Sequence, residues 1–142
     1  LDQEKHLIKN LKRVFLILIN LSFQKYGTNL EYQQQVLMNM ADILIDIYLA
    51  ESIYLRVSKN LKEFDAEKKT VTESLVKLYT YESTQRAISS FKEVVFNIKE
   101  RREHQDMIKV VNKLLSYKDN PNVIELRRII GKYVVQKNEY PF

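Results

Sequence analysis

The apolar residues of this chain recur mainly every three or four positions, the spacing of one face of an α-helix. The first row of them ends before Gly27, a residue type that often ends helices in the left-handed conformation. Asn29 can then cap a second helix that extends to about Asn60. This second segment is apolar around most of its circumference, so we expect it to be the central and most buried helix.

The same spacing continues to the C-terminus. A third helix spans about residues 71–98 and is either continuous or broken near residues 82–84. A shorter helix covers residues 107–114, and Pro121 fits the first turn of a last helix. No segment alternates between apolar and polar residues at period two, as strands do. We therefore predict an all-α fold, an antiparallel bundle of four to five helices that forms one domain over residues 1–142.

The composition agrees with a helical fold and excludes several other classes. The chain has 142 residues but only 2 Gly, 2 Pro and no Cys, which argues against turn-rich β folds and excludes disulfides and thiolate metal sites. Its net charge of +5 comes from basic residues scattered over different helices, so we expect no nucleic-acid partner. The apolar run over residues 14–24 is shorter than the roughly 20 residues that span a bilayer. A membrane span is therefore not expected. Membrane contact is not expected either, because no stretch combines a basic face with a continuous apolar one.

Cofactor and metal motifs are absent from the sequence. A phosphate-binding loop needs several glycines, whereas Gly27 and Gly131 are isolated. Helical metal sites use a Glu three residues before a His, and neither His6 nor His104 has one. We expect no catalytic residue, no cofactor and no metal in this segment.

Several charged residues interrupt the apolar second and third segments. Asp42 and Asp46 lie four positions apart and share one helix face, and Arg56 follows on the same helix. Glu82 and Arg86 are spaced likewise on the third helix. We interpret these residues as ion pairs that fix the helix register, with Arg86 as the main partner of Asp46. An acid–base pair is the alternative, but it would need a cleft and a substrate-facing partner that the sequence does not indicate.

The C-terminal residues carry apolar and aromatic side chains close to an end of the chain. Few residues remain there to cover them, and exposed apolar surface usually marks an interaction site. We therefore predict an interaction surface formed by Tyr133, Val134, Val135, Tyr140 and Phe142.

A longer pattern carries a family resemblance. Its elements are Tyr26-Gly27, the run of residues 35–38, Ala41-Asp42, the run of residues 46–48 and Leu55-Arg56. With these elements, the segment from residue 23 to residue 60 resembles the C-terminal helical extension of acyl-CoA dehydrogenases of the very-long-chain type and their bacterial relatives. A Glu and an Arg in the next helix of that extension match Glu82 and Arg86.

The resemblance implies a function for a longer protein. In such enzymes a flavin-dependent core, which would lie before Leu1, removes two hydrogens from an acyl-CoA thioester in fatty-acid β-oxidation. FAD is then expected in the parent enzyme, and this segment is expected to dock on its own dehydrogenase core or on a second subunit of a homo-oligomer. A bacterial cytoplasmic location is expected too. The chain begins in mid-pattern at Leu1, which also suggests a piece of a longer chain. The alternative is a free-standing helical adaptor that binds other proteins.

Overall fold

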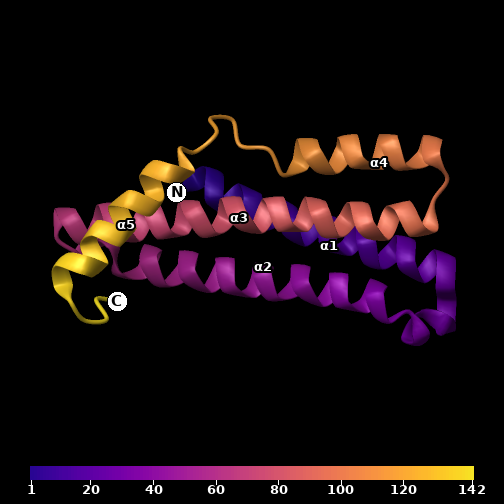
Figure 1. The fold of residues 1–142 in the computed structure, drawn as a ribbon, viewed down its shortest axis with the longest axis horizontal. Helices are drawn as coiled ribbons and strands as arrows, with labels where there is room; N and C mark the ends of the chain where they lie inside the picture. The colour runs from indigo at the N-terminus through magenta and orange to yellow at the C-terminus, as the bar shows by residue number, and fades with distance from the viewer.

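The computed structural model describes residues 1–142 and contains five α-helices and no strand (Figure 1). The helices are α1 (Asp2–Tyr26), α2 (Gln34–Asn60), α3 (Ala66–Ile98), α4 (Arg101–Leu114) and α5 (Val123–Lys137). Short 3-10 helices over Gly27–Tyr32 and Leu61–Glu63 follow α1 and α2. The predicted all-α bundle is confirmed, and the third helix is continuous.

The turn between α1 and α2 departs from the predicted capping. Gly27 ends α1 with a positive φ of 54°, and its N–H donates to the carbonyl of Phe23. The chain then makes a 3-10 turn that includes Asn29, so α2 begins later, at Gln34, without a side-chain cap. The prediction that Asn29 caps α2 is therefore wrong. Asp65 does cap α3, since its Oδ1 accepts the N–H of Lys68 at 2.8 Å.

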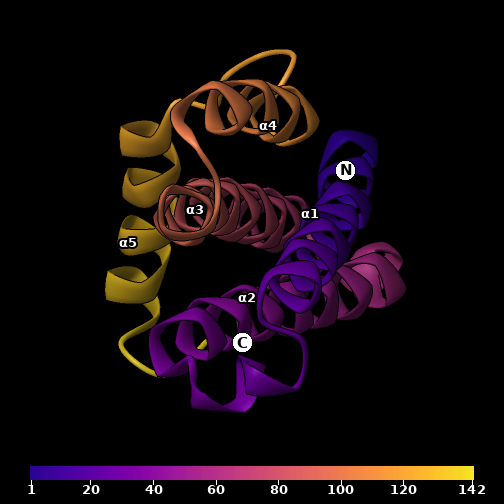
Figure 2. The same cartoon turned by 90° about the vertical axis from the view of Figure 1, so that its right-hand side faces the viewer.

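The central helix is α3 rather than α2. Viewed along the bundle, α3 lies in the middle, with α1, α2, α4 and α5 around it (Figure 2). The prediction that α2 is the most buried helix is wrong. Its apolar residues divide between one face toward α1 and α3 and another face that is exposed.

The core lies where α1, α2, α3 and α4 meet. Apolar side chains from all four helices form one buried cluster there. Its members include Leu11, Val14 and Leu18 from α1, Ile43 and Ile47 from α2, Phe91, Val94 and Val95 from α3, and Val111 from α4. The fifth helix crosses the bundle obliquely at one end and packs on α3 (Figure 1).

Candidate functional site

A buried carboxylate lies at the contact between α2 and α3. Asp46 is 7% exposed. Arg86 donates two hydrogen bonds to its carboxylate, from Nε to Oδ2 at 2.8 Å and from Nη2 to Oδ1 at 3.0 Å. The hydroxyl of Tyr79 donates to the same Oδ1 at 3.0 Å. Arg86 therefore pairs with a charge that would be costly to bury alone, and the two bonds join α2 to α3.

The protonation of this cluster suits a structural role. The hydrogen bond to Asp46 raises the pKa of the Arg86 guanidinium above its ordinary value. Burial, together with the bond to Asp46, raises the pKa of the Tyr79 hydroxyl. Both donors therefore keep their protons at neutral pH, whereas a general acid or base needs a pKa near the working pH.

Glu82 extends the network to α5. Its carboxylate lies 3.7 Å from Nη1 of Arg86 and 2.8 Å from Nη2 of Arg127. Arg127 was not among the residues picked from the sequence, because nothing in the spacing of α5 indicates which of its basic residues faces α3. One chain of charges thus joins α2, α3 and α5.

The other two residues proposed for ion pairs do not form them. Asp42 is exposed and has no cation within salt-bridge distance, because Arg86 is engaged by the carboxylate one turn further along. The guanidinium of Arg56 instead donates to the backbone carbonyl of Phe142 at 3.0 Å. Arg56 thus contacts the last residue of the chain and pairs with no Asp or Glu side chain.

The two glycines and the potential metal ligands lie apart in the structure. Gly27 is exposed at a helix end and Gly131 lies inside α5, so neither belongs to a loop that could close on a phosphate. There is also no group of three or more His, Cys, Asp or Glu side chains that could hold a metal ion. None of the five helices is both long and apolar enough to cross a membrane.

The predicted C-terminal interaction surface is present only in part. Val134, Val135 and Tyr140 are exposed, Val135 by 78% and Tyr140 by 81%. Tyr133 is buried, so the prediction that it contributes to the surface is wrong. It lies on the inner side of α5, and the tail folds back so that the Phe142 ring lies 5.9 Å from its ring. Tyr133 and Phe142 thus pack against each other, while Val134, Val135 and Tyr140 remain exposed.

A more extended apolar surface runs along α2. Leu37, Leu44, Tyr48 and Leu55 recur at helical spacing on one face, and we call them the α2 stripe. All four are exposed, Tyr48 by 70% and Leu55 by 57%. They are exposed although the same helix contributes buried residues on its opposite side. The near-continuous apolar pattern of α2 is the sequence feature behind this stripe. The sequence alone could not show that one face of α2 lacks a partner within the chain.

Helix α1 adds to the same side of the molecule. Leu16 is 63% exposed and Phe23 is 57% exposed, seven residues apart on one face of α1. Lys12, four residues before Leu16, forms an ion pair of 2.6 Å with Glu51 of α2. Glu51 lies seven residues after Leu44, so the pair connects the two exposed rows.

Comparison with known proteins identifies the family of this helical domain. The family described as acyl-CoA dehydrogenase, C-terminal domain, matches residues 10–113. The chain belongs to this family. The resemblance predicted from the sequence is thereby confirmed.

Two relatives match nearly the whole chain. A probable acyl-CoA dehydrogenase of Bacillus subtilis (strain 168) is 28% identical over 140 residues, which are 99% of this chain and 23% of the relative. A crystal structure of an acyl-CoA dehydrogenase complexed with FAD from Bacillus anthracis is 27% identical and superposes with a TM-score of 0.90. That match covers 98% of this chain and 24% of the solved chain. The chain therefore spans about a quarter of the length of these relatives.

Proposed function

We propose that this chain is the non-catalytic C-terminal domain of an FAD-dependent acyl-CoA dehydrogenase of the fatty-acid β-oxidation type. It docks through the α2 stripe onto the dehydrogenase core of its own polypeptide. In this proposal FAD and the acyl-CoA bind to the rest of that polypeptide. This proposal is supported by the family membership, and by the absence of a phosphate-binding loop among the described residues.

The exposed α2 stripe is the observation that carries the docking role. Soluble monomers rarely expose contiguous apolar patches of large area, and those that occur often mark interaction sites. Taking one Leu side chain from full exposure to full burial contributes about 1.5–3 kcal/mol. The four stripe residues are 37–70% exposed, so covering each of them contributes part of that energy. Association opposes this with a loss of freedom. That loss is smaller when the partner belongs to the same chain.

The relatives suggest the partner. This chain covers 23% and 24% of the two relatives, so most of each relative lies outside the match. In this proposal the partner is the part of the polypeptide that corresponds to those unmatched residues. Docking within one polypeptide needs no separate binding event. The C-terminal tail is a less suitable docking surface, because Tyr133 is buried and Phe142 packs against it.

A substitution pair in the full-length protein tests this function. Tyr48→Glu places a charge at the centre of the α2 stripe, and Val135→Glu places the same charge on the exposed side of α5. Both side chains are exposed within the domain, so neither change should disturb the domain's own core. We expect Tyr48→Glu to lower the thermal midpoint and to speed proteolytic release of the domain. Val135→Glu should change neither quantity.

Three further readouts separate the possible outcomes. Flavin absorbance checks that the full-length protein holds FAD, and single-turnover bleaching by an acyl-CoA checks the chemistry, which both variants should retain. Light-scattering mass distinguishes the two docking partners. Tyr48→Glu should leave the oligomer intact if the domain docks on its own core, and should break the oligomer if the domain docks on a second subunit. Abolished bleaching in Tyr48→Glu with unchanged mass, stability and proteolysis would show that the domain serves catalysis instead. A full-length protein without flavin would refute the assigned enzyme class.

A further inference from the structure

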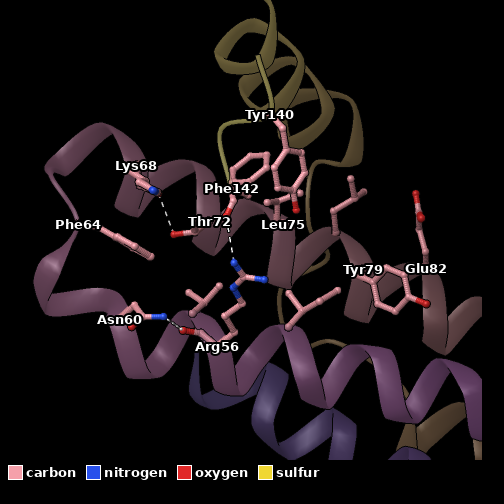
Figure 3. A pocket seen from close by; sticks show the side chains of 13 residues that line it. Arg56, Asn60, Phe64, Lys68, Thr72, Leu75, Tyr79, Glu82, Tyr140 and Phe142 are labelled. Carbon is pink, nitrogen blue, oxygen red and sulfur yellow. Dashed lines mark hydrogen bonds between the residues drawn. The ribbon is translucent and has the colours of Figure 1, made fainter. Parts of the chain in front are cut away.

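A cavity of about 520 Å³ lies between the C-terminal end of α2, the N-terminal half of α3 and the tail, residues 138–142 (Figure 3). Apolar side chains such as Val57 of α2 and Leu75 of α3 line its walls. Tyr140 and Phe142 close it from the side of the tail. Side chains that line a cavity have fewer packing partners than side chains in the core. The tail therefore gains less packing energy there than a core segment does.

Helix α5, which precedes the tail, buries little of its surface. Tyr133 is the one buried residue among the 15 residues of α5, whereas α3 has 12 buried residues among 33. Leu126 and Ile130, on the same face as Tyr133, are only partly buried. Segments with few buried apolar contacts open at a lower free energy than the core does. We therefore expect α5 to open more easily than α3.

Helix α5 is capped at both ends by its own residues. At its start the side chain of Asn122 accepts the N–H of Glu125 at 3.1 Å. At its end Asn138 has a left-handed φ of 51°, and its N–H donates to the carbonyl of Val134 at 3.1 Å. Residues 116–122, which connect α4 to α5, are not helical, and residues 118–120 are exposed. The helix can therefore move on this connection without losing its caps.

Two polar side-chain contacts attach α5 and the tail to other helices. Nη2 of Arg127 lies 2.8 Å from the carboxylate of Glu82, but these side chains are 59% and 30% exposed, so solvent screens the pair. The second contact runs from Nη2 of Arg56 on α2 to the carbonyl of Phe142 at 3.0 Å (Figure 3). The Phe142 ring lies 5.9 Å from the Tyr133 ring. The tail is thus joined to α5 as well as to α2.

We propose that α5 and the tail, residues 123–142, form a lid that opens as one unit over the cavity while α1, α2 and α3 stay folded. Residues 116–122 are its hinge, and the contacts of Arg127 and Arg56 hold it closed. Opening uncovers the apolar side chains of the cavity wall, such as Val57 and Leu75. The proposal does not rest on the docking role, because the α2 stripe lies outside the lid.

Hydrogen exchange of the full-length protein, followed by mass spectrometry, tests the lid. We expect the amides of residues 123–137 to exchange at least about tenfold faster than those of residues 84–98 in α3. Arg127→Gln should speed exchange of residues 123–137 about two- to fivefold, the effect of a partly exposed ion pair. Arg128→Gln is the matched control. Arg128 is 75% exposed and pairs within α5, with Glu125 at 3.8 Å, so its loss should change the rate less than about twofold.

Arg56→Gln distinguishes a lid from a tail that opens alone. The Arg56 side chain lies on α2 and donates to the tail, so its loss speeds exchange in residues 123–137 only when α5 and the tail open together. We expect that acceleration, by a factor similar to that of Arg127→Gln. Unchanged rates in residues 123–137 of Arg56→Gln would overturn the proposal.

Residues 84–98 provide the check that the rest of the domain stays folded. Their exchange rates should be the same in Arg127→Gln, Arg56→Gln and the unchanged protein. Equal acceleration of residues 84–98 and 123–137 would overturn the lid, because the domain would then open as a whole. Equal protection of these two segments in the unchanged full-length protein would overturn it as well.

Discussion

Removal of the charges of Asp46 and Arg86 should reveal a strong coupling between α2 and α3. The substitutions Asp46→Asn and Arg86→Gln are made singly and together in the 142-residue chain. The double-mutant cycle then isolates the energy of the pair, because each single change removes one of the two charges joined by the bonds of 2.8 and 3.0 Å.

The expected magnitude follows from burial. Exposed ion pairs couple by about 0.2–1 kcal/mol, whereas breaking a fully buried pair costs about 3–5 kcal/mol. The Asp46 side chain is 10% exposed, but that of Arg86 is 49% exposed, so solvent screens one partner. We therefore expect a coupling of about 1–3 kcal/mol, between the two limits.

The chain provides a matched control in the ion pair between Lys12 and Glu51. These side chains are 47% and 40% exposed, although the pair is as short as 2.6 Å. A parallel cycle of Lys12→Gln and Glu51→Gln should give less than about 1 kcal/mol and should weaken further in high salt. Urea denaturation measures all the variants. A coupling between Asp46 and Arg86 no larger than that of the control would refute the claim that this pair fixes the helix register.

Two other predictions concern the core and the pH dependence. Ile47 is 5% exposed, so Ile47→Ala should lower the free energy of unfolding by about 2–5 kcal/mol in urea denaturation. Leu44 is 50% exposed, so Leu44→Ala should lower it by less than about 1 kcal/mol. Equal losses would contradict the assigned faces of α2. Burial raises the pKa of the Tyr117 hydroxyl, so the folded chain holds this proton more tightly than the unfolded chain does. This contribution to stability is present below the ordinary Tyr pKa of about 10 and is lost as pH rises above it, so Tyr117→Phe should flatten the fall in unfolding free energy there. A fall that is as steep in Tyr117→Phe would show that other groups cause it.

Helical periodicity was sufficient to predict the fold class and the number of helices. Rows of apolar residues at three- and four-residue spacing marked each helix, and Gly27 marked the end of α1 correctly, because its positive φ favours glycine. The same reasoning misplaced the start of α2. A 3-10 turn over Gly27–Tyr32 has no periodic signature that distinguishes it from a first helical turn.

The pairing of Asp46 with Arg86 was predicted because a carboxylate within an apolar segment needs a cation opposite. The prediction that Asp42 and Arg56 also take part in ion pairs was wrong. For Asp42 the reason is that sequence spacing does not tell which of two carboxylates on one face meets the single cation. The role of Arg127 was missed for a related reason. Its partner lies 45 residues earlier on another helix, and only the packing of α5 on α3 brings them together.

The prediction that α2 is the most buried helix failed because an apolar helix face does not have to be covered by the same chain. A helix that is apolar around most of its circumference was taken to be surrounded by its own chain. In the structure one face of α2 packs on α1 and α3 while the stripe of Leu37, Leu44, Tyr48 and Leu55 faces outward. An apolar helix in a chain that matches only part of its relatives can therefore be covered by residues outside the chain.

Chemical access to the α2 stripe tests the central claim most directly. The chain has no Cys, so Tyr48→Cys and Val135→Cys each introduce one reporter thiol, which mass spectrometry follows as a maleimide-labelled peptide. Labelling rates are compared between the 142-residue chain and the full-length protein. The docking account predicts that Tyr48→Cys reacts readily in the 142-residue chain and several-fold more slowly in the full-length protein, while Val135→Cys reacts equally in both. Equal rates for Tyr48→Cys in the two proteins would contradict it, because the α2 stripe would then be as exposed in the full-length protein as in the domain.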